Sequence, residues 1–362
     1  NANRGAAVAS SKETSCGNPV IASTGNKIET EMDFAGGGEA PLFLQREYNK
    51  YWNGVGLFGK HWISSFDYRL TFGTSDPNAC YPRPGGGACG IGTNTIVFAH
   101  RPDARTIRFV KNATDGIFYE DKANPVARIV KQADGSFIHY AENNDVEKYS
   151  PAGYVSEVKG ETGVGWTFGY SGTYPIRVTH TSGRYVDLVW NAGQLTSVRD
   201  PAGNYYGYAY HIDYFGTGTH LLSAMSRPGT PGTAIAYHYE DTRFPGALTG
   251  KSFGGVRYSY FTYHANGRTA SSEHGAGRDR YSFSYVGSDD AGLTTDVVNP
   301  LGLTTQFDFF NGRQQGQQNQ ASANCPAASR YSTVDANGNE NLVTDFNNNI
   351  TDYDYNAKGQ LI

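Results

Sequence analysis

Apolar and polar residues alternate at every second position through much of the chain after residue 150. Clear examples are the segments WTFGY at 166–170, YSFSY at 281–285 and YDY at 353–355. Alternation at period two is typical of a β-strand that buries one face. Comparable segments begin at positions 166, 186, 206, 237, 258, 281, 307, 331 and 353. This recurrence predicts a repeat protein.

Each repeat has the same internal order of elements. An aromatic strand leads to a turn, a second and less aromatic strand follows, and another turn such as DPAGN at 200–204, NPLGL at 299–303 or DANGN at 335–339 closes the unit. Pro, Gly and Asn supply the backbone angles that such turns require. One repeat is therefore one β-hairpin, and because a lone hairpin is marginally stable, successive hairpins must pair edge to edge.

These patterns predict an all-β fold, a continuous spiralling antiparallel sheet of stacked hairpins with its aromatic side chains on a buried inner face. The alternative for an aromatic stripe is an exposed surface that stacks on sugar rings. The inner-face aromatic residues predicted in this way are Trp166, Phe168, Tyr170, Trp190, Tyr206, Tyr208, Tyr237, Tyr239, Tyr258, Tyr260, Tyr281, Phe283, Phe307, Phe309, Tyr353 and Tyr355.

The first 150 residues carry no such repeat. Residues 1–15 are small and polar and are expected to be a flexible segment, whereas residues 16–150 contain short apolar strands, for example at 28–34, 41–49 and 106–112. We therefore predict a separate N-terminal β domain at 16–150, followed by a repeat array at 151–362. The array ends inside a hairpin, so we expect the natural protein to continue beyond Ile362 or another chain to cover that edge.

Composition agrees with a turn-rich β protein. The chain has 45 Gly and 26 Tyr among 362 residues, 18% charged residues and a net charge of −4. This weak charge gives no electrostatic case for nucleic-acid binding, and no apolar stretch is long enough for a membrane-spanning helix. The composition favours a secreted or cell-surface location.

The four cysteines are candidates for disulfides. Cys80 and Cys89 bracket a Pro/Gly loop, and Cys16 and Cys325 form a possible long-range pair. The alternative is four buried free thiols, and the spacing does not suggest a zinc site.

Other candidate chemistry is weak, and we predict no catalytic residues, cofactor or metal. Gly85, Gly87 and Gly90 fit GxGxxG, but no helix is expected after them to bind a phosphate. The segments at 335–339 and 345–349 resemble half of a calcium loop, and turns built on Asp and Asn side chains explain them better. The alternation also explains Asp352 and Asp354 as a solvated strand face rather than an acid–base pair.

The chain resembles the Rhs/YD-repeat family. The segments 17–20 (GNPV), 24–27 (TGNK), 46–49 (REYN) and 56–70 match, in order, the N-terminal domain that opens many bacterial Rhs proteins. YDYNAKGQLI at 353–362 is similar to the YD repeat itself, and the resemblance extends over residues 16–362.

The resemblance implies a curved β-shell like those of Rhs toxins, the toxin-complex cocoon and teneurins. In bacterial members the shell encloses a C-terminal toxin, which is released by aspartates near a DPxGL motif. Here the nearest string, NPLGL, has Asn299 in place of the aspartate. Autoproteolysis by this chain is therefore not expected.

The sequence is compatible with three functions. The first is a non-enzymatic scaffold, part of a shell whose partner is an encapsulated or downstream polypeptide. The second is an adhesin or self-assembling surface protein that associates with identical subunits through sheet edges and binds glycans. The third is a hydrolase with paired carboxylates on the sheet, which requires two carboxylates within roughly 10 Å of each other in one cleft. The length of the reading frame beyond Ile362 separates the first from the second.

Overall fold

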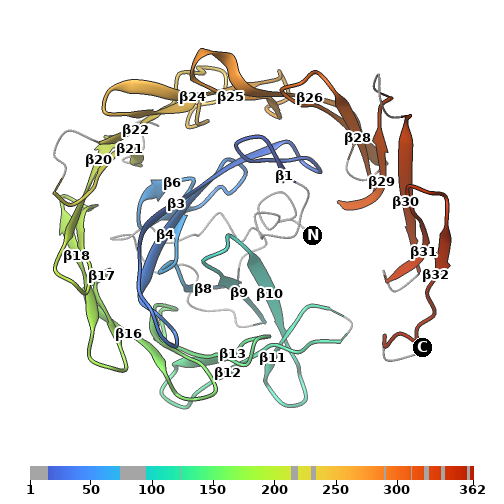
Figure 1. Cartoon of the computed structure of the whole chain (residues 1–362). Helices are drawn as coiled ribbons and strands as arrows, with labels where there is room; N and C mark the ends of the chain where they lie inside the picture. The colour runs from blue at the N-terminus through green and yellow to red at the C-terminus, as the bar shows by residue number, and fades with distance from the viewer. Residues whose placement is uncertain are drawn as a thin grey trace. The chain divides into compact units, whose positions relative to one another are not determined.

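The computed structural model describes residues 15–73, 95–122, 124–212, 219–229, 234–288, 291–310, 312–321, 326–335, 339–356 and 359–362. Strands dominate, and the helical element in these residues is one short 3-10 turn, Gly275–Gly277. Most strands pair antiparallel with the next strand along the chain (Figure 1). The predicted all-β fold of consecutive antiparallel hairpins is confirmed. Within the described residues, no helix has the length and apolar character that crossing a membrane requires.

Contacts divide the chain into two compact units, each with its own packing. Among the described residues, unit 1 comprises 29–256 and unit 2 comprises 15–28 with 257–362. The predicted boundary after residue 150 falls inside unit 1, where strand β14 (Val146–Tyr149) pairs with strand β15 (Val155–Lys159). The predicted division into an N-terminal domain at 16–150 and a repeat array at 151–362 therefore stays a prediction.

Unit 1 contains a long antiparallel outer sheet. From β9 onward, each strand is hydrogen-bonded to its successor up to β23, and β8 pairs with β9. Its strands are β8 (Arg69–Phe72), β9 (Ile96–His100), β10 (Thr106–Lys111), β11 (Phe118–Glu120), β12 (Arg128–Lys131), β13 (Phe137–Tyr140), β14 (Val146–Tyr149), β15 (Val155–Lys159), β16 (Gly165–Ser171), β17 (Tyr174–His180), β18 (Tyr185–Asn191), β19 (Gln194–Arg199), β20 (Tyr205–His211), β21 (Leu221–Ser226), β22 (Ile235–His238) and β23 (Gly250–Phe253).

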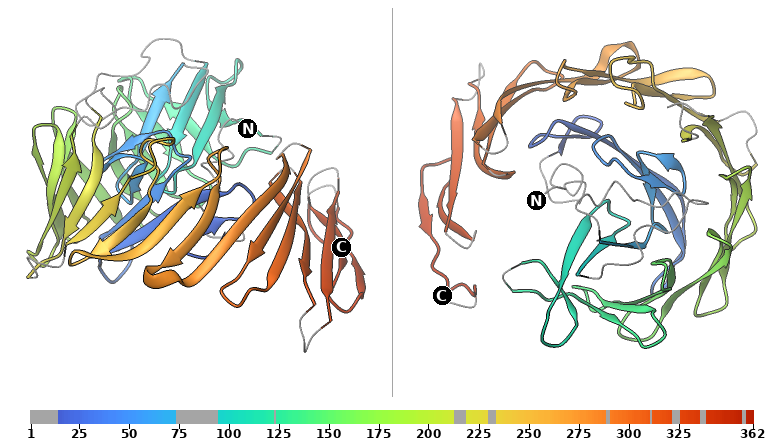
Figure 2. Two further views of the ribbon diagram at one scale, coloured as in Figure 1. Left: turned by 90° about the horizontal axis from the view of Figure 1, so that it is seen from above. Right: turned by 180° about the vertical axis from the view of Figure 1, so that it is seen from behind.

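A smaller inner layer packs against this outer sheet within unit 1. It consists of β3 (Asn26–Ala35), β4 (Phe43–Asn49) and β7 (Trp62–Ser64), in that order. The short hairpin of β5 (Val55–Gly56) and β6 (Gly59–Lys60) joins β21 through the pairing of Gly59 with Leu221. In both face-on views, β3 and β4 lie on the concave side of the strands from β16 to β22 (Figures 1 and 2).

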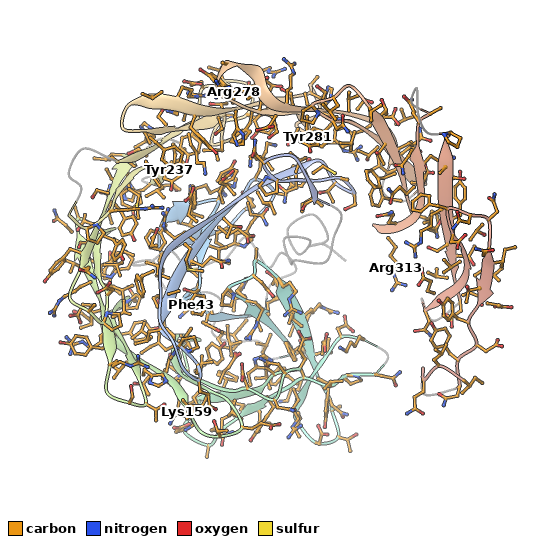
Figure 3. The ribbon with its side chains drawn as sticks, in the orientation of Figure 1. Phe43, Lys159, Tyr237, Arg278, Tyr281 and Arg313 are labelled. Atoms are coloured by element: carbon orange, nitrogen blue, oxygen red, sulfur yellow. The ribbon has the colours of Figure 1, made fainter. Side chains whose placement is uncertain are left out.

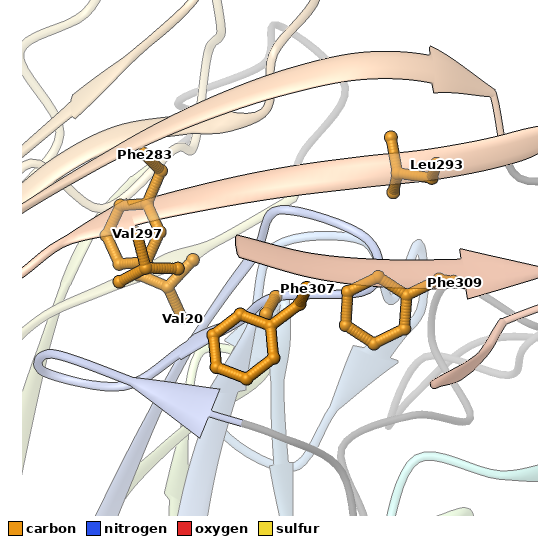
Figure 4. Packing of buried hydrophobic residues seen from close by; sticks show 7 residues of the cluster. Val20, Phe283, Leu293, Val297, Phe307 and Phe309 are labelled. Atoms are coloured by element: carbon orange, nitrogen blue, oxygen red, sulfur yellow. The ribbon is translucent and has the colours of Figure 1, made fainter. Parts of the chain in front are cut away.

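Unit 2 continues the hairpin pattern with its own apolar cluster. Val20 and Ala22 pack there against Phe283, Val297 and neighbouring residues (Figure 4). The strands of unit 2 are β1 (Ser15–Cys16), β2 (Val20–Ile21), β24 (Val256–Tyr263), β25 (Thr269–His274), β26 (Arg278–Ser288), β27 (Gly292–Val298), β28 (Thr304–Phe310), β29 (Arg313–Asn319), β30 (Ala328–Val334), β31 (Glu340–Thr344) and β32 (Ile350–Asp352).

Two kinds of turn connect the strands. In the five-residue turns, the amide of the first residue binds the carbonyl of the fifth, and the amide of the fourth binds the carbonyl of the first. The fourth residue has a positive φ, as at Gly203 (90°), which explains the Gly or Asn of the repeat motif. The turns built in this way include 132–136, 141–145, 150–154, 160–164, 180–184, 200–204, 264–268, 299–303, 345–349 and 356–360. Two-residue turns such as Ala192-Gly193, with both φ angles positive, connect some of the other strands.

In several five-residue turns, the first residue also closes the turn through its side chain. Oδ1 of Asp200 accepts hydrogen bonds from the amides of Ala202 and Asn204, both at 2.9 Å, and Oδ2 accepts one from Nδ2 of Asn204 at 2.8 Å. Asp345 does the same in its own turn, and Asp335 accepts hydrogen bonds from the amide and the side chain of Asn339. These side chains serve turn geometry, as predicted for the segments that resemble calcium loops; Asn337 lies outside the described residues.

Removing this side-chain closure will weaken unit 1 measurably. We expect Asp200→Ala to lower the free energy of unfolding by about 1–2 kcal/mol, because several hydrogen bonds to the turn are lost. Asp200→Asn keeps an oxygen acceptor and should lose less than half as much. Urea unfolding followed by tryptophan fluorescence measures both values, and equal stability of wild type and Asp200→Ala would contradict the closure.

Candidate functional site

The aromatic face of the outer sheet in unit 1 is covered by the inner layer. The ring centroids of Trp166 and Phe43 are 5.8 Å apart, and those of Tyr206 and Phe34 are 5.6 Å apart. Trp62 packs edge-on against Tyr237 at 4.8 Å. Figure 3 shows side chains filling the space between these layers, with Phe43 labelled on one and Tyr237 on the other. We call this contact the anchoring interface.

A buried ion pair lies at the centre of the anchoring interface. Arg46 of β4 donates from Nε and Nη2 to the two carboxylate oxygens of Asp33 on β3, at 2.7 and 2.8 Å. The outer sheet completes the group, because the hydroxyl of Tyr208 donates to Asp33 at 2.6 Å and Arg46 donates to the hydroxyl of Tyr237 at 3.2 Å. Both charged side chains are almost fully buried. Burial alone would lower the pKa of Arg46, but Tyr237 and Asp33 outweigh it and hold the pKa above its ordinary value.

Tyrosine hydroxyls extend this polar contact along the interface. Nε1 of Trp62 donates to the hydroxyl of Tyr239 at 3.0 Å, which in turn donates to the carbonyl of Leu222 at 2.8 Å. The hydroxyl of Tyr48 donates to the carbonyl of Gly246 at 2.9 Å. Each of these buried hydroxyl and indole N–H groups therefore has a hydrogen-bond partner. An unpaired polar group would be costly in these low-dielectric surroundings.

A second ion cluster joins β3 to β23. The ammonium group of Lys251 contacts Glu29 at 2.5 Å and Glu31 at 2.7 Å. All three residues are less than 9% exposed. Burial by itself would lower the pKa of Lys251, but the two carboxylates raise it above the ordinary value.

A third charged cluster lies among β9, β13 and β14. Glu147 contacts Arg101 through both oxygens, at 2.5 and 2.6 Å, and also accepts hydrogen bonds from His139 at 2.9 Å and from the Tyr149 hydroxyl at 2.5 Å. Burial alone would raise the pKa of Glu147, but Arg101 and His139 reverse this, so the pKa lies well below its usual range. Glu147 is therefore a buried anion held by its partners.

Glu47 differs from these anions because no cation of the described residues forms an ion pair with it. The residue is 8% exposed, and its Oε1 makes no hydrogen bond within the described part of the chain. Burial raises the pKa of Glu47 to about 8, and the charge of Asp103 adds to the effect. At neutral pH the folded protein thus holds a protonated Glu47.

This gives a pH-dependent prediction for Glu47→Gln. The folded pKa is raised above the unfolded value, so the folded state keeps a proton that the unfolded state releases, and stability falls as the pH rises from about 4.5 to about 8. The neutral variant escapes this loss and should be more stable than wild type by about 2–4 kcal/mol at pH 8, with little difference at pH 4.5. Urea unfolding at both pH values tests this. Exposed Glu161→Gln is the control, and a pH-independent difference for Glu47→Gln would contradict the assignment.

The chemistry available to these clusters is structural. Asp33, Glu29, Glu31 and Glu147 are buried and are occupied by cations or hydroxyl donors. Among the described residues, no three His, Cys, Asp or Glu side chains form a group that could hold a metal ion. Asp352 and Asp354, the candidate acid–base pair, are exposed.

Most of the predicted inner-face aromatic residues are buried or half-buried. In unit 1, Trp166, Phe168, Tyr206, Tyr208, Tyr237 and Tyr239 are buried, and Tyr170 and Trp190 are half-buried. In unit 2, Phe283, Phe307 and Phe309 are buried, and Tyr281, Tyr353 and Tyr355 are half-buried.

Two of the predicted inner-face residues lie on the opposite face. Tyr258 is 44% exposed and Tyr260 is 40% exposed, whereas Phe261 and Tyr263 of the same strand are buried. The segment has aromatic residues in both phases, YSYFTY, so alternation alone could not select the buried one. The prediction for Tyr258 and Tyr260 was wrong.

The predicted pairing of Cys16 with Cys325 stays a prediction, because Cys325 lies outside the described residues. Among the described residues, Cys16 forms no disulfide and packs against the apolar cluster of unit 2, where burial raises the pKa of its thiol. Its place opposite Val20 in the β1–β2 hairpin directs it to that cluster. Cys80, Cys89 and Cys325, like Gly85, Gly87 and Gly90, lie outside the described residues.

In unit 2 the TGNK motif at 24–27 has a clear structural role. Gly25 has φ of 71°, and a Cβ there would lie 2.7 Å from Cβ of Arg268, so only glycine fits. Its carbonyl accepts hydrogen bonds from both the amide and the hydroxyl of Thr269, each at 2.9 Å. Lys27 is fully buried, with Nζ 4.0 Å from the ring centroid of Phe261 and bonded to backbone carbonyls.

Sequence reasoning missed the charged partners of the interface, although the signal was present. In IETEMDF at 28–34, Glu29, Glu31 and Asp33 alternate and so share one strand face. Arg46 likewise shares its face with Leu44 and Tyr48. Charged residues in the buried phase of a strand indicate buried ion pairs. Glu147 and its distant partner Arg101 gave no comparable signal.

Comparisons with known proteins bear on the N-terminal part of the chain. Residues 17–109 match a family model. The matched family is DUF6531, a domain of unknown function. The DUF6531 segment contains Asp33, Arg46 and Trp62, and thus the inner side of the anchoring interface. No curated protein matches the chain.

A solved structure also resembles the chain. The crystal structure of TcdB2-TccC3 is similar over 95% of this chain and 24% of its own, with 10% sequence identity and a TM-score of 0.22. The chain thus spans about a quarter of the length of that protein.

Proposed function

We propose that the chain is a non-enzymatic scaffold, part of an Rhs-type β-shell that encloses a C-terminal toxin or other polypeptide in a longer parent protein. The observation that carries the proposal is the anchoring interface in unit 1. There, the DUF6531 segment uses Arg46, Asp33 and a series of aromatic rings to fasten itself to the hairpin sheet. The charged and aromatic side chains of this interface hold two layers of polypeptide together, as expected of a structural scaffold.

The motifs that resemble Rhs proteins support the same proposal residue by residue. TGNK provides Gly25 and Lys27 within unit 2, and REYN provides Arg46 and Tyr48 within unit 1. Each motif thus supplies packing or hydrogen bonding to the sheet it contacts. A secreted or cell-surface location and the absence of enzymatic activity belong to this proposal as well.

Enclosure is tested by limited proteolysis of the complete reading frame that contains this chain. We expect the polypeptide after the repeats to resist protease in the wild type. It should become sensitive when Arg46→Met loosens the anchoring interface, whereas Arg108→Met, at a surface ion pair with Asp121, should leave it protected. Equal cleavage of that polypeptide in all three proteins, or a reading frame that stops near Ile362, would contradict enclosure.

The alternative, association through sheet edges, has its own supporting observation. Among the pairings of described residues, β32 is bonded on one side to β31, and its Ile350 is 70% exposed. Such an edge can pair with another chain. Concentration-dependent oligomers of the complete protein that disappear in Ile350→Lys would favour this function over enclosure.

A further inference from the structure

The turn between β17 and β18 places a serine next to a histidine. It has the sequence HTSGR at 180–184 and the backbone hydrogen bonds of a five-residue turn. Oγ of Ser182 lies 2.8 Å from Nδ1 of His180, and the amide of Ser182 donates to the same nitrogen at 3.0 Å. His180 is 6% exposed, whereas Ser182 is exposed. A solvent-accessible hydroxyl thus contacts a shielded imidazole.

The loop between β3 and β4 fixes the orientation and the tautomer of His180. Nε2 of His180 lies 3.2 Å from the carbonyl oxygen of Glu39. Since a carbonyl oxygen only accepts, Nε2 carries the proton of the neutral ring and Nδ1 carries the lone pair. The same loop is held on the sheet by Trp166, whose Nε1 donates to the carbonyl of Ala40 at 2.9 Å. The lone pair of His180 is therefore directed at Ser182.

Arg184 completes the group around the serine hydroxyl. Its Nε donates to Oγ of Ser182 at 3.2 Å. Because Oγ accepts from Arg184, its own hydrogen is available for Nδ1 of His180. The hydrogen bonds then run in one direction, from the guanidinium through the hydroxyl and the imidazole to the carbonyl of Glu39. A hydroxyl beside a base that a third group orients is the arrangement of an activated nucleophile, and the guanidinium favours negative charge on Oγ.

A second turn of the same design shows that the fold does not require the serine. The turn HANGR at 264–268 has the same backbone hydrogen bonds, and Nε2 of its His264 lies 2.8 Å from the carbonyl oxygen of Phe283. Its third residue is Asn266, which has no hydroxyl. Histidine as the first residue thus has a structural role in both turns, whereas the serine hydroxyl is an addition at 180–184.

We propose that Ser182 is an acyl acceptor, a site at which the chain takes one acyl group from an activated ester such as a thioester. Oγ attacks the carbonyl carbon of the ester, and the proton of the hydroxyl passes to Nδ1 of His180. The carbon–oxygen or carbon–sulfur bond of the ester then breaks, and the leaving group takes that proton. The products are an O-acylserine and a free alcohol or thiol, so no further reactant is needed.

The same geometry favours a single modification over repeated turnover. In the acylserine, Oγ has no hydrogen to donate, and the amide of Ser182 keeps its hydrogen bond to Nδ1 of His180. The one lone pair of Nδ1 is then occupied, which disfavours the activation of a water molecule for hydrolysis. A chain that is modified once is not an enzyme, and the proposal does not depend on the scaffold function.

The test is incubation of the folded chain with p-nitrophenyl acetate, followed by mass spectrometry of the intact chain and of its peptides. We expect one acetyl group on Ser182. It should form far faster there than on Ser136, whose hydroxyl donates to the carboxylate of Asp134 instead of to a histidine. His180→Asn should slow the acetylation of Ser182 about a hundredfold or more, the usual effect of losing a general base.

Two variants remove one member of the pair each and preserve the turn. His180→Asn keeps a side-chain acceptor for the backbone of the turn, as Asn299 provides in NPLGL. Ser182→Asn gives this turn the third residue that HANGR has, and it should abolish the modification at this position. Circular dichroism shows whether each variant is folded.

Three results would overturn the proposal. The first is acetylation of Ser182 no faster than that of Ser136, and the second is an equal rate at Ser182 in wild type and His180→Asn. The third is release of p-nitrophenol by Ser182→Asn at the wild-type rate, which would assign the reaction to another group. Because Ser182 is exposed in a turn, its variant keeps the test valid even if His180→Asn does not fold.

Discussion

Arg46→Met will lower the free energy of unfolding of unit 1 by about 3–5 kcal/mol, because it leaves the carboxylate of Asp33 buried without its cation. Among the described residues, the hydroxyl of Tyr208 still donates to Asp33, but a hydroxyl cannot neutralise a charge. All four tryptophans lie between residues 29 and 256. Urea unfolding followed by tryptophan fluorescence therefore reports on unit 1.

Two further variants test whether the loss in Arg46→Met comes from its buried ion pair with Asp33. Arg108→Met removes an arginine from an exposed ion pair and should cost less than about 1 kcal/mol. The double variant Arg46→Met/Asp33→Leu replaces both charges and should regain a large part of the loss, because no charge stays buried alone. Recovery will be incomplete, since Tyr208 and Tyr237 lose their hydrogen-bond partners. A loss for Arg46→Met as small as that of Arg108→Met would refute the central role of the ion pair.

Glu147→Ala is the second change with a large expected effect, again about 3–5 kcal/mol at neutral pH. It removes the anion that faces Arg101 and also the acceptor for His139 and Tyr149. The folded pKa of Glu147 is depressed below the unfolded value. Its contribution is therefore present above about pH 4.5 and is lost as the pH falls further. The stability gap between wild type and variant should narrow in acid.

The control for Glu147 is Glu142→Ala, at an exposed ion pair with Arg105. It should change the unfolding free energy by less than about 1 kcal/mol. Arg105 outweighs burial and lowers the pKa of Glu142, so this small effect should also shrink in acid, but by far less than that of Glu147→Ala. Urea unfolding of the three proteins at pH 7 and pH 4 supplies the comparison. If the effect of Glu147→Ala were equal at both values, the network would act through packing and not through charge.

The strands and turns could be read from the sequence because both depend on local physics. Alternation at period two reflects the two faces of a strand. In a turn such as DPAGN, the first residue (Asp or Asn) and the Gly satisfy the backbone of that same turn. The alternation also predicted which aromatic residues are buried wherever only one of the two strand faces is apolar, as at 166–170. In β24 both phases are aromatic, and the choice of Phe261 over Tyr260 depends on neighbours that are distant in sequence.

The partners of the buried charges could not be derived in the same way. Arg46 and Tyr237 are 191 residues apart, and Lys251 and Glu29 are 222 apart. Nothing local in either segment encodes the other, so these contacts depend on how the inner layer packs on the outer sheet.

The buried Lys27 gives unit 2 a chemical reporter. Its amine is sealed beneath Phe261 and bound to main-chain oxygens, so an acylating reagent in the solvent can modify it only after this part of the chain opens. The rate of its acylation, followed by peptide mass mapping, would measure how often that happens. Unit 2 contains no tryptophan, so this one lysine would supply what tryptophan fluorescence cannot, the opening frequency of unit 2.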